Sequence, residues 1–174
     1  MAIFVFGLLS DPDVEWMAQA GVQHPIKDGE VLIEEGQPAN SVILLLKGEC
    51  VVTKRSAGEI ARLGVGEIVG EMSFLDSEPP SATVTASGNG LALFLDKETL
   101  ARKLETDIAF GCRFYRALAV FLTNRMRNTT RRMGGALDVA AKSVAKDDAE
   151  TRVPDALSEA RARFDHLLKS VVSR

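Results

Sequence analysis

The chain has 174 residues, of which 46% are hydrophobic and 26% are charged, and its formal net charge is −3. This length and apolar fraction predict one folded domain with room for an appendage, and they exclude a wholly disordered chain. Residues 1–100 carry a net charge of −9, residues 101–135 carry +6 and residues 136–174 are neutral, and an acidic body with one basic segment argues against a general nucleic-acid binder.

The first predicted element is a helix that begins after Ser10, with Pro12 in its first turn, and ends at Gly21. From there to residue 95, short runs of β-forming residues alternate with turn signals, which predicts an antiparallel sandwich or barrel. The continuous apolar run 42–46 is typical of a strand buried on both faces. The expected strands are 31–33, 41–46, 50–53, 60–63, 66–70, 81–85 and 91–95, with a turn at Lys47-Gly48-Glu49.

Helical patterning returns at Lys97, with a short helix over 97–105 and a long one from about Asp107 to about Arg132. The long helix has apolar residues on more than one stripe, so it must cover something beyond its own core. We therefore predict a homodimer through the helix at 107–132. Its apolar residues are Ile108, Phe110, Phe114, Tyr115, Leu118, Phe121, Leu122 and Met126.

After a first domain at 1–133, the Ala-rich and then charged segment 134–154 predicts a weak helix or a linker. An amphipathic helix is expected at 155–174. Two interpretations remain open for its apolar seam: it packs back onto the parent domain, or it pairs with itself or docks to a protein partner. The seam consists of Leu157, Ala160, Phe164, Leu167 and Val171.

The sequence also predicts a compartment. The apolar N-terminal residues have no Lys or Arg before them and acidic residues follow, so we do not interpret them as a signal peptide. No run of about 18 apolar residues predicts a membrane span. Two cysteines, Cys50 and Cys112, are expected to be buried free thiols, and the protein to be cytoplasmic.

The segment from Gly64 to Val84 carries the most chemistry. Gly70-Glu71-Met72-Ser73 leaves a strand and enters a single helical turn, whose free backbone N–H groups can hold an anion. Glu71 can accept hydrogen bonds from sugar hydroxyls, and Ser81 and Thr83 offer hydroxyls to the same pocket. The residue spacing alone is also consistent with a purely structural role, in which the segment is a helical turn that joins two strands and is capped by Glu71.

This segment resembles the phosphate-binding cassette of the cyclic nucleotide-binding domain family, and Gly36, Gly48 and Gly66 fall where that family has turn glycines. The resemblance spans roughly residues 8–132. It implies an α+β fold, an antiparallel eight-stranded β-roll (jelly-roll-like) flanked by an N-terminal helix and C-terminal helices. It also implies a sensor, in which cAMP or cGMP enters the roll and the C-terminal helices move over it.

The resemblance also implies roles for single residues. Glu71 matches the cassette residue that holds the ribose 2′-hydroxyl, and Ser81 matches the small hydroxyl residue that faces the phosphate or base. Thr129 and Thr130 resemble the hydroxyl pair that touches adenine across the dimer interface of bacterial catabolite activators; a solvated helix end is the alternative. The expected ligand-binding residues are Val69, Gly70, Glu71, Met72, Ser73, Pro80, Ser81, Ala82, Thr83, Thr129 and Thr130.

One departure from the family matters. Its cassette carries an arginine immediately before Ser81, where this chain has Pro80. A charge-assisted pair with the cyclic phosphate is worth about 1.5–3 kcal/mol, so its loss is expected to weaken cAMP binding roughly 10- to 150-fold and to leave Glu71 without a positive neighbour. A replacement cation is available only if the long helix folds over the pocket; otherwise this basic cluster is a solvated helix end. The cluster comprises Arg125, Arg127, Arg131 and Arg132.

Other functions find little support in the sequence. No helix-turn-helix follows the long helix, so we expect no DNA binding by this chain alone. His24 and His166 lack the neighbours of a metal site, and no catalytic constellation is present, so no enzyme activity, cofactor or metal is expected. Two hypotheses remain: a regulatory sensor that binds a cyclic nucleotide or related ligand, or a degenerate fold used for dimerisation or partner docking.

Overall fold

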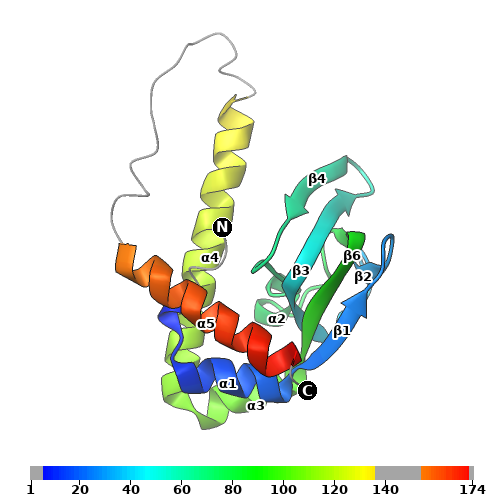
Figure 1. Ribbon diagram of the computed structural model, residues 1–174. Coiled ribbons are helices and arrows are strands. Elements are labelled where there is room, and N and C mark those ends of the chain that lie inside the picture. Colours follow the sequence, from blue (N-terminus) through cyan, green and yellow to red (C-terminus); the bar gives the residue numbers. More distant parts are fainter. Residues whose placement is uncertain (1–5, 136–153, 173–174) are drawn as a thin grey trace.

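The computed structural model describes residues 6–135 and 154–172, in which a β-sheet lies beside a group of helices (Figure 1). The helices are α1 (Asp11–Ala20), α2 (Met72–Leu75), α3 (Lys97–Thr106), α4 (Ile108–Gly135) and α5 (Pro154–Val172). The strands are β1 (Val22–Ile26), β2 (Val31–Ile33), β3 (Ser41–Lys54), β4 (Gly58–Leu63), β5 (Ile68–Val69) and β6 (Thr83–Asp96). The expected combination of an antiparallel sheet with flanking helices is confirmed.

The sheet is built around its two longest strands, β3 and β6, which pair antiparallel along most of their length. β1 and β2 add to β6, and β4 and β5 add to β3. The apolar run 42–46 lies in β3, where alternate side chains pack on opposite faces, as expected of a strand buried on both sides. Val42, Leu44 and Leu46 join the core under the helices, whereas Ile43 and Leu45 join the second core inside the roll.

The described part of the chain has six strands rather than the expected eight, because two expected breaks lie inside continuous strands. The turn expected at Lys47-Gly48-Glu49 is a pair of register shifts within β3. Gly48 has a φ of 95°, and a Cβ at Gly90 in β6 would lie 2.3 Å from the Lys47 carbonyl oxygen. Glycines therefore let the two strands bulge and bend together here, and the turn signal in the sequence marks that bulge.

The helices form one layer with a shared core against the sheet. Ser10 caps α1 and Gly21 ends it, as the sequence predicts. The seam of α5 is buried with residues of α1 and with Phe6, whose ring meets Phe164 edge-on at 5.2 Å. This confirms the interpretation that the seam packs back onto the parent domain, so this face is not open to a partner. The Leu157 side chain and residues 136–153, expected to form a linker or weak helix, lie outside the described residues.

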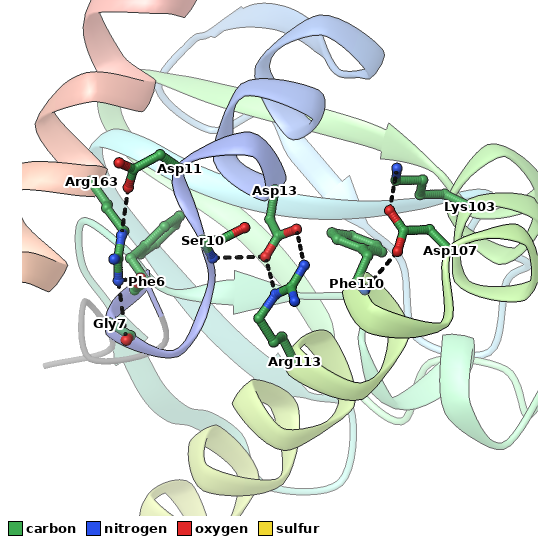
Figure 2. A network of polar contacts seen from close by, with 10 residues as sticks. All are labelled: Phe6, Gly7, Ser10, Asp11, Asp13, Lys103, Asp107, Phe110, Arg113 and Arg163. Atoms are coloured by element: carbon green, nitrogen blue, oxygen red, sulfur yellow. Dashed lines mark hydrogen bonds and ion pairs between the residues drawn. The ribbon is translucent and has the colours of Figure 1, made fainter.

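Ion pairs fix these helices to one another (Figure 2). The Arg113 guanidinium on α4 donates Nε to Asp13 Oδ2 at 2.6 Å and Nη2 to Asp13 Oδ1 at 2.8 Å. Arg163 on α5 donates Nε to Asp11 Oδ1 at 2.8 Å, and Asp107 Oδ1 accepts from the Phe110 backbone N–H at 2.9 Å. The first half of α4 is therefore held to α1 by a bidentate ion pair between Arg113 and Asp13.

The two thiols differ. Cys50 is buried in the roll, and burial raises its pKa to about 11. Cys112 is exposed on α4, so the expectation of a buried thiol is wrong there. The α4 face that carries Cys112 points away from the core, although apolar neighbours in sequence suggested burial.

The contact between Asp13 and Arg113 predicts a pH-dependent stability. Burial alone raises the pKa of Asp13, but the hydrogen bonds from Arg113 and Ser10 outweigh it, and the pKa lies below its ordinary value. Asp13 therefore stabilises the fold above about pH 4, and this contribution is lost as the pH falls through the folded-state pKa. We expect Arg113→Gln to lower the free energy of unfolding by about 2 kcal/mol at pH 7 and by less at pH 3.

Urea unfolding measures this effect through the fluorescence of Trp16, which contacts Phe110 edge-on at 5.2 Å. The exposed Arg116, on the same helix, provides the matched control. Arg116→Gln should change the free energy of unfolding by no more than about 0.5 kcal/mol. Equal losses for the two variants, or a loss for Arg113→Gln that grows toward pH 3, would contradict the assignment.

Candidate functional site

A cavity of about 400 Å³ opens between the roll, the α2 turn and α4. Its wall is mostly apolar, with side chains from β2, β3, β4, β6 and α4. Its charged lining residues are Arg62, Glu67, Glu71 and Arg125. An apolar cavity with a few converging polar groups is the usual form of a small-molecule site.

Nine of the eleven residues expected to bind a ligand line this cavity. Two do not: Thr83 lies beside the loop after β2, where its Oγ1 accepts from the Glu35 backbone N–H at 3.0 Å, and Thr130 is exposed on α4. Thr129 reaches the cavity edge, and its hydroxyl donates to the Arg125 carbonyl oxygen at 3.0 Å. The residues brought together are Val69, Gly70, Glu71, Met72, Ser73, Pro80, Ser81, Ala82 and Thr129.

Backbone geometry at Gly70 positions the carboxylate of Glu71. Gly70 has a φ of 81°, and a Cβ there would lie 2.7 Å from the Ser41 carbonyl oxygen. Only glycine meets both constraints without displacing β3. The chain turns sharply at this point from β5 into α2, and it directs the Glu71 side chain inward, where its exposure is 2%.

The buried Glu71 carboxylate is paired with Arg125, which reaches it from α4. Arg125 Nη1 donates to Glu71 Oε1, and its Nη2 donates to the Ile68 carbonyl oxygen at 3.2 Å. The guanidinium also lies 3.7 Å from Glu67 Oε2 and 4.7 Å from the centre of the Phe121 ring. One arginine of the long helix thus contacts four groups at the cavity wall.

This pair corrects the expectation that Glu71 lacks a positive neighbour. Burial raises the pKa of the Glu71 carboxyl, and the Arg125 guanidinium acts in the opposite direction. Of the four arginines that the sequence offered as a replacement cation, Arg125 is the one that reaches the cavity. Arg127 is exposed, and the side chains of Arg131 and Arg132 lie outside the described residues.

A second contact joins the α2 turn to the helical layer, and sequence reasoning did not find it. Lys97 Nζ, at the start of α3, donates to Ser73 Oγ at 2.8 Å, and Ser73 Oγ donates to the Gly70 carbonyl oxygen at 3.3 Å. Burial lowers the pKa of Lys97. The α2 turn is therefore tied to both α3 and α4.

Two further features are absent from the described residues 6–135 and 154–172. No helix there is both long enough and apolar enough to cross a membrane. The same ranges contain no group of three or more His, Cys, Asp and Glu side chains arranged to hold a metal ion.

Comparison with protein families and curated proteins identifies relatives of the central part of the chain. The family model for the cyclic nucleotide-binding domain matches residues 23–107. The chain is 33% identical over 89 residues to a cAMP-dependent protein kinase regulatory subunit of Yarrowia lipolytica, covering 51% of this chain and 24% of that protein. It is 29% identical over 83 residues to the corresponding subunit of Dictyostelium discoideum, covering 44% and 25%. The chain thus spans about a quarter of the length of these relatives.

Solved structures share the fold. A cyclic nucleotide-binding domain from Methylobacillus flagellatus superposes with a TM-score of 0.66 and 27% identity, covering 79% of this chain and 76% of that one. The Thermus thermophilus catabolite activator protein superposes with a TM-score of 0.63 over 98% of this chain and 87% of that one. At 18% identity, the second match shows a common fold alone.

The ion pair between Glu71 and Arg125 predicts a specific stability loss. Arg125→Met leaves a buried carboxylate without its partner, so we expect a loss of about 3 kcal/mol at pH 7. Because burial then raises the Glu71 pKa further, the loss should increase as the pH rises through that pKa and should be smaller near pH 5. Urea unfolding at both pH values measures it.

Two further variants make the test specific. Arg127→Met removes an exposed arginine two residues along the same helix and should change the free energy of unfolding by no more than about 0.5 kcal/mol. Combining Glu71→Gln with Arg125→Met removes both charges and should recover part of the loss. A combined loss equal to the sum of the single losses would mean that the two side chains do not interact.

Proposed function

We propose that this chain, whose residues 23–107 belong to the cyclic nucleotide-binding domain family, is a non-enzymatic regulatory sensor for a cyclic nucleotide or related small ligand. One observation carries the proposal: the residues on both sides of the cassette, 69–73 and 80–82, meet in a single cavity that α4 covers. The relatives from Yarrowia lipolytica and Dictyostelium discoideum are regulatory subunits of cAMP-dependent protein kinase, which supports a regulatory role.

Pro80 weakens the affinity of this cavity for cAMP. It lines the cavity at the position where the family's cassette has an arginine, and it brings neither a charge nor a backbone N–H. The Pro80 carbonyl oxygen accepts from the Gly36 backbone N–H at 2.8 Å, which holds the loop in place. A cyclic phosphate therefore meets a fixed, uncharged wall at this position.

Ligand binding is transmitted through α4. Its first half is held by Asp13 and the buried core, whereas Arg125 is the charged contact between its second half and the cassette. A ligand that hydrogen-bonds to Glu71 shares this carboxylate with Arg125 and thereby alters the position of this part of α4. In this proposal, the changed position of α4 is what a partner of the sensor detects.

The chain acts as a homodimer through α4. Phe110, Phe114 and Phe121 face the core, but α4 carries a second stripe with alternating spacings of four and three, which is exposed except at Leu122, where the side chain packs partly against the core. Such spacing is typical of a two-stranded coiled coil. This stripe comprises Ile108, Cys112, Tyr115, Ala119, Leu122 and Met126, and Ile108 and Met126 are 74% and 70% exposed.

A second candidate function is a degenerate fold used only for dimerisation or docking. The outward stripe of α4 is the observation that favours it, because this surface requires no ligand. The two functions differ in their response to nucleotides: the sensor is stabilised by a ligand, by about 2.7 kcal/mol at 100 times its Kd, and the docking module is not.

Restoring the cassette arginine tests the role of Pro80. Pro80→Arg should raise the affinity for cAMP by 10- to 150-fold, because it adds a charge-assisted pair with the phosphate worth about 1.5–3 kcal/mol. Isothermal titration calorimetry with cAMP measures it. The matched control is Pro79→Arg, which adds the same charge at an exposed neighbouring position outside the cavity and should leave the affinity within twofold. Equal effects of the two variants would contradict the proposal.

Disulfide formation at Cys112, which lies on the second stripe of α4, tests the dimer. In a parallel pair of helices, the two copies of Cys112 face each other within disulfide range, so mild oxidation should yield a disulfide-linked dimer. Tyr115→Glu should convert the dimer to a monomer in analytical ultracentrifugation, whereas Thr123→Glu, exposed beside the stripe, should not. A wild-type chain that sediments as a monomer at a protein concentration on the order of 1 mM would rule out this dimer.

A further inference from the structure

We infer that the cavity takes an uncharged nucleoside in preference to the corresponding cyclic nucleotide. This inference rests on the proposed function, because it assigns the ligand class of the same cavity. It depends on the charges that line the cavity and on the partners that those charges already have.

The formal charges of the described lining residues cancel, and each is engaged. Arg125 is paired with Glu71 and lies near Glu67. Arg62, at the cavity edge, donates Nε to Glu59 Oε1 at 2.9 Å and lies 3.4 Å from Glu49 Oε2. Lys97, behind the α2 turn, is not part of the lining and donates to Ser73. Among the described residues, a phosphate that enters this cavity thus finds two carboxylates and no cation that lacks an anionic partner.

A phosphate could still bind Arg125, but only at the expense of Glu71. That carboxylate is 2% exposed, so water cannot replace the lost guanidinium. Leaving one partner of a buried ion pair alone costs more than a surface contact returns. Glu67 and Glu71 would also repel the bound phosphate across the cavity. A ligand without charge avoids both costs.

The same cavity suits a nucleoside. An ionised carboxylate can accept about four hydrogen bonds. At Glu71, Arg125 takes one at Oε1 and the backbone N–H groups of Glu71 and Met72 take two more, which leaves capacity for one sugar hydroxyl. The apolar wall offers a surface for the flat base, with Val52, Leu63 and Val84 from the roll. The volume of about 400 Å³ falls within the usual range of small-molecule sites. A nucleoside therefore matches this cavity: its ribose donates a hydrogen bond to Glu71, its base lies on the apolar wall, and it carries no phosphate.

Matched ligand pairs test the inference by isothermal titration calorimetry on the full chain at pH 7. Adenosine is compared with cAMP and guanosine with cGMP, so that each pair shares a base and differs in the cyclic phosphate. We expect at least one nucleoside to bind at least 10-fold more tightly than its cyclic nucleotide. The 2′,3′-dideoxy form of that nucleoside should bind at least 10-fold more weakly, because it lacks the ribose hydroxyl that donates a hydrogen bond to the Glu71 carboxylate.

Pro80→Arg provides the second arm. It adds a cation at the cavity wall and should reverse the order, so that the cyclic nucleotide binds more tightly than the nucleoside. Pro79→Arg, with the same charge outside the cavity, should keep the wild-type order.

The outcomes separate this inference from the proposed function. If the wild-type chain binds cAMP or cGMP more tightly than the nucleosides, the inference is wrong, but the proposed sensor function is unaffected. Equal affinities within twofold overturn it as well. No binding of any of the four ligands overturns the inference together with the sensor, and leaves the dimerisation or docking module as the function.

Discussion

The buried contact between Glu71 and Arg125 is the interaction on which the site depends. It joins two parts of the chain that lie 54 residues apart, the cassette turn and the long helix. The carboxylate is not stable alone at this depth, because it is almost without solvent and burial shifts its pKa upward. The pair holds α4 against the cavity wall, and in the proposed function it also engages a cation that a phosphate would otherwise use.

The fold makes this contact possible by fixing only part of α4. Asp13 and Arg113 hold the beginning of the helix to α1, and Phe110, Phe114 and Leu118 are buried beside them. Beyond Phe121, the polar contacts with the roll made by the described side chains of α4 come from Arg125. In the proposed sensor, a change at this one contact therefore alters the second half of α4, while Asp13 and the core hold its base. The C-terminal helix α5 strengthens that base, since it packs on α1 rather than on the cavity.

Much of this arrangement is encoded locally and was predicted from the sequence. Capping at Ser10, the alternation within 42–46 and the α2 turn after Gly70 all depend on neighbouring residues. The failures have long-range causes. The turn signal at Gly48 marks a bulge because Gly90, on another strand, packs against it, and the partner of Glu71 could not be chosen among four arginines without knowing where α4 passes. The contact of Lys97 with Ser73 also lies beyond local patterns, and the exposure of Cys112 depends on which face of a two-stripe helix meets the core.

The most direct measurement of the central claim is the guanidinium NMR signal of Arg125 in protein labelled with ¹⁵N-arginine. If Arg125 is committed to Glu71, its Nη–H resonances are protected from solvent exchange and stay unchanged when cAMP is added in large excess. A saturable shift of those resonances with cAMP, accompanied by titration of a released Glu71 carboxyl, would contradict the account, because it would show the guanidinium passing from the carboxylate to the phosphate.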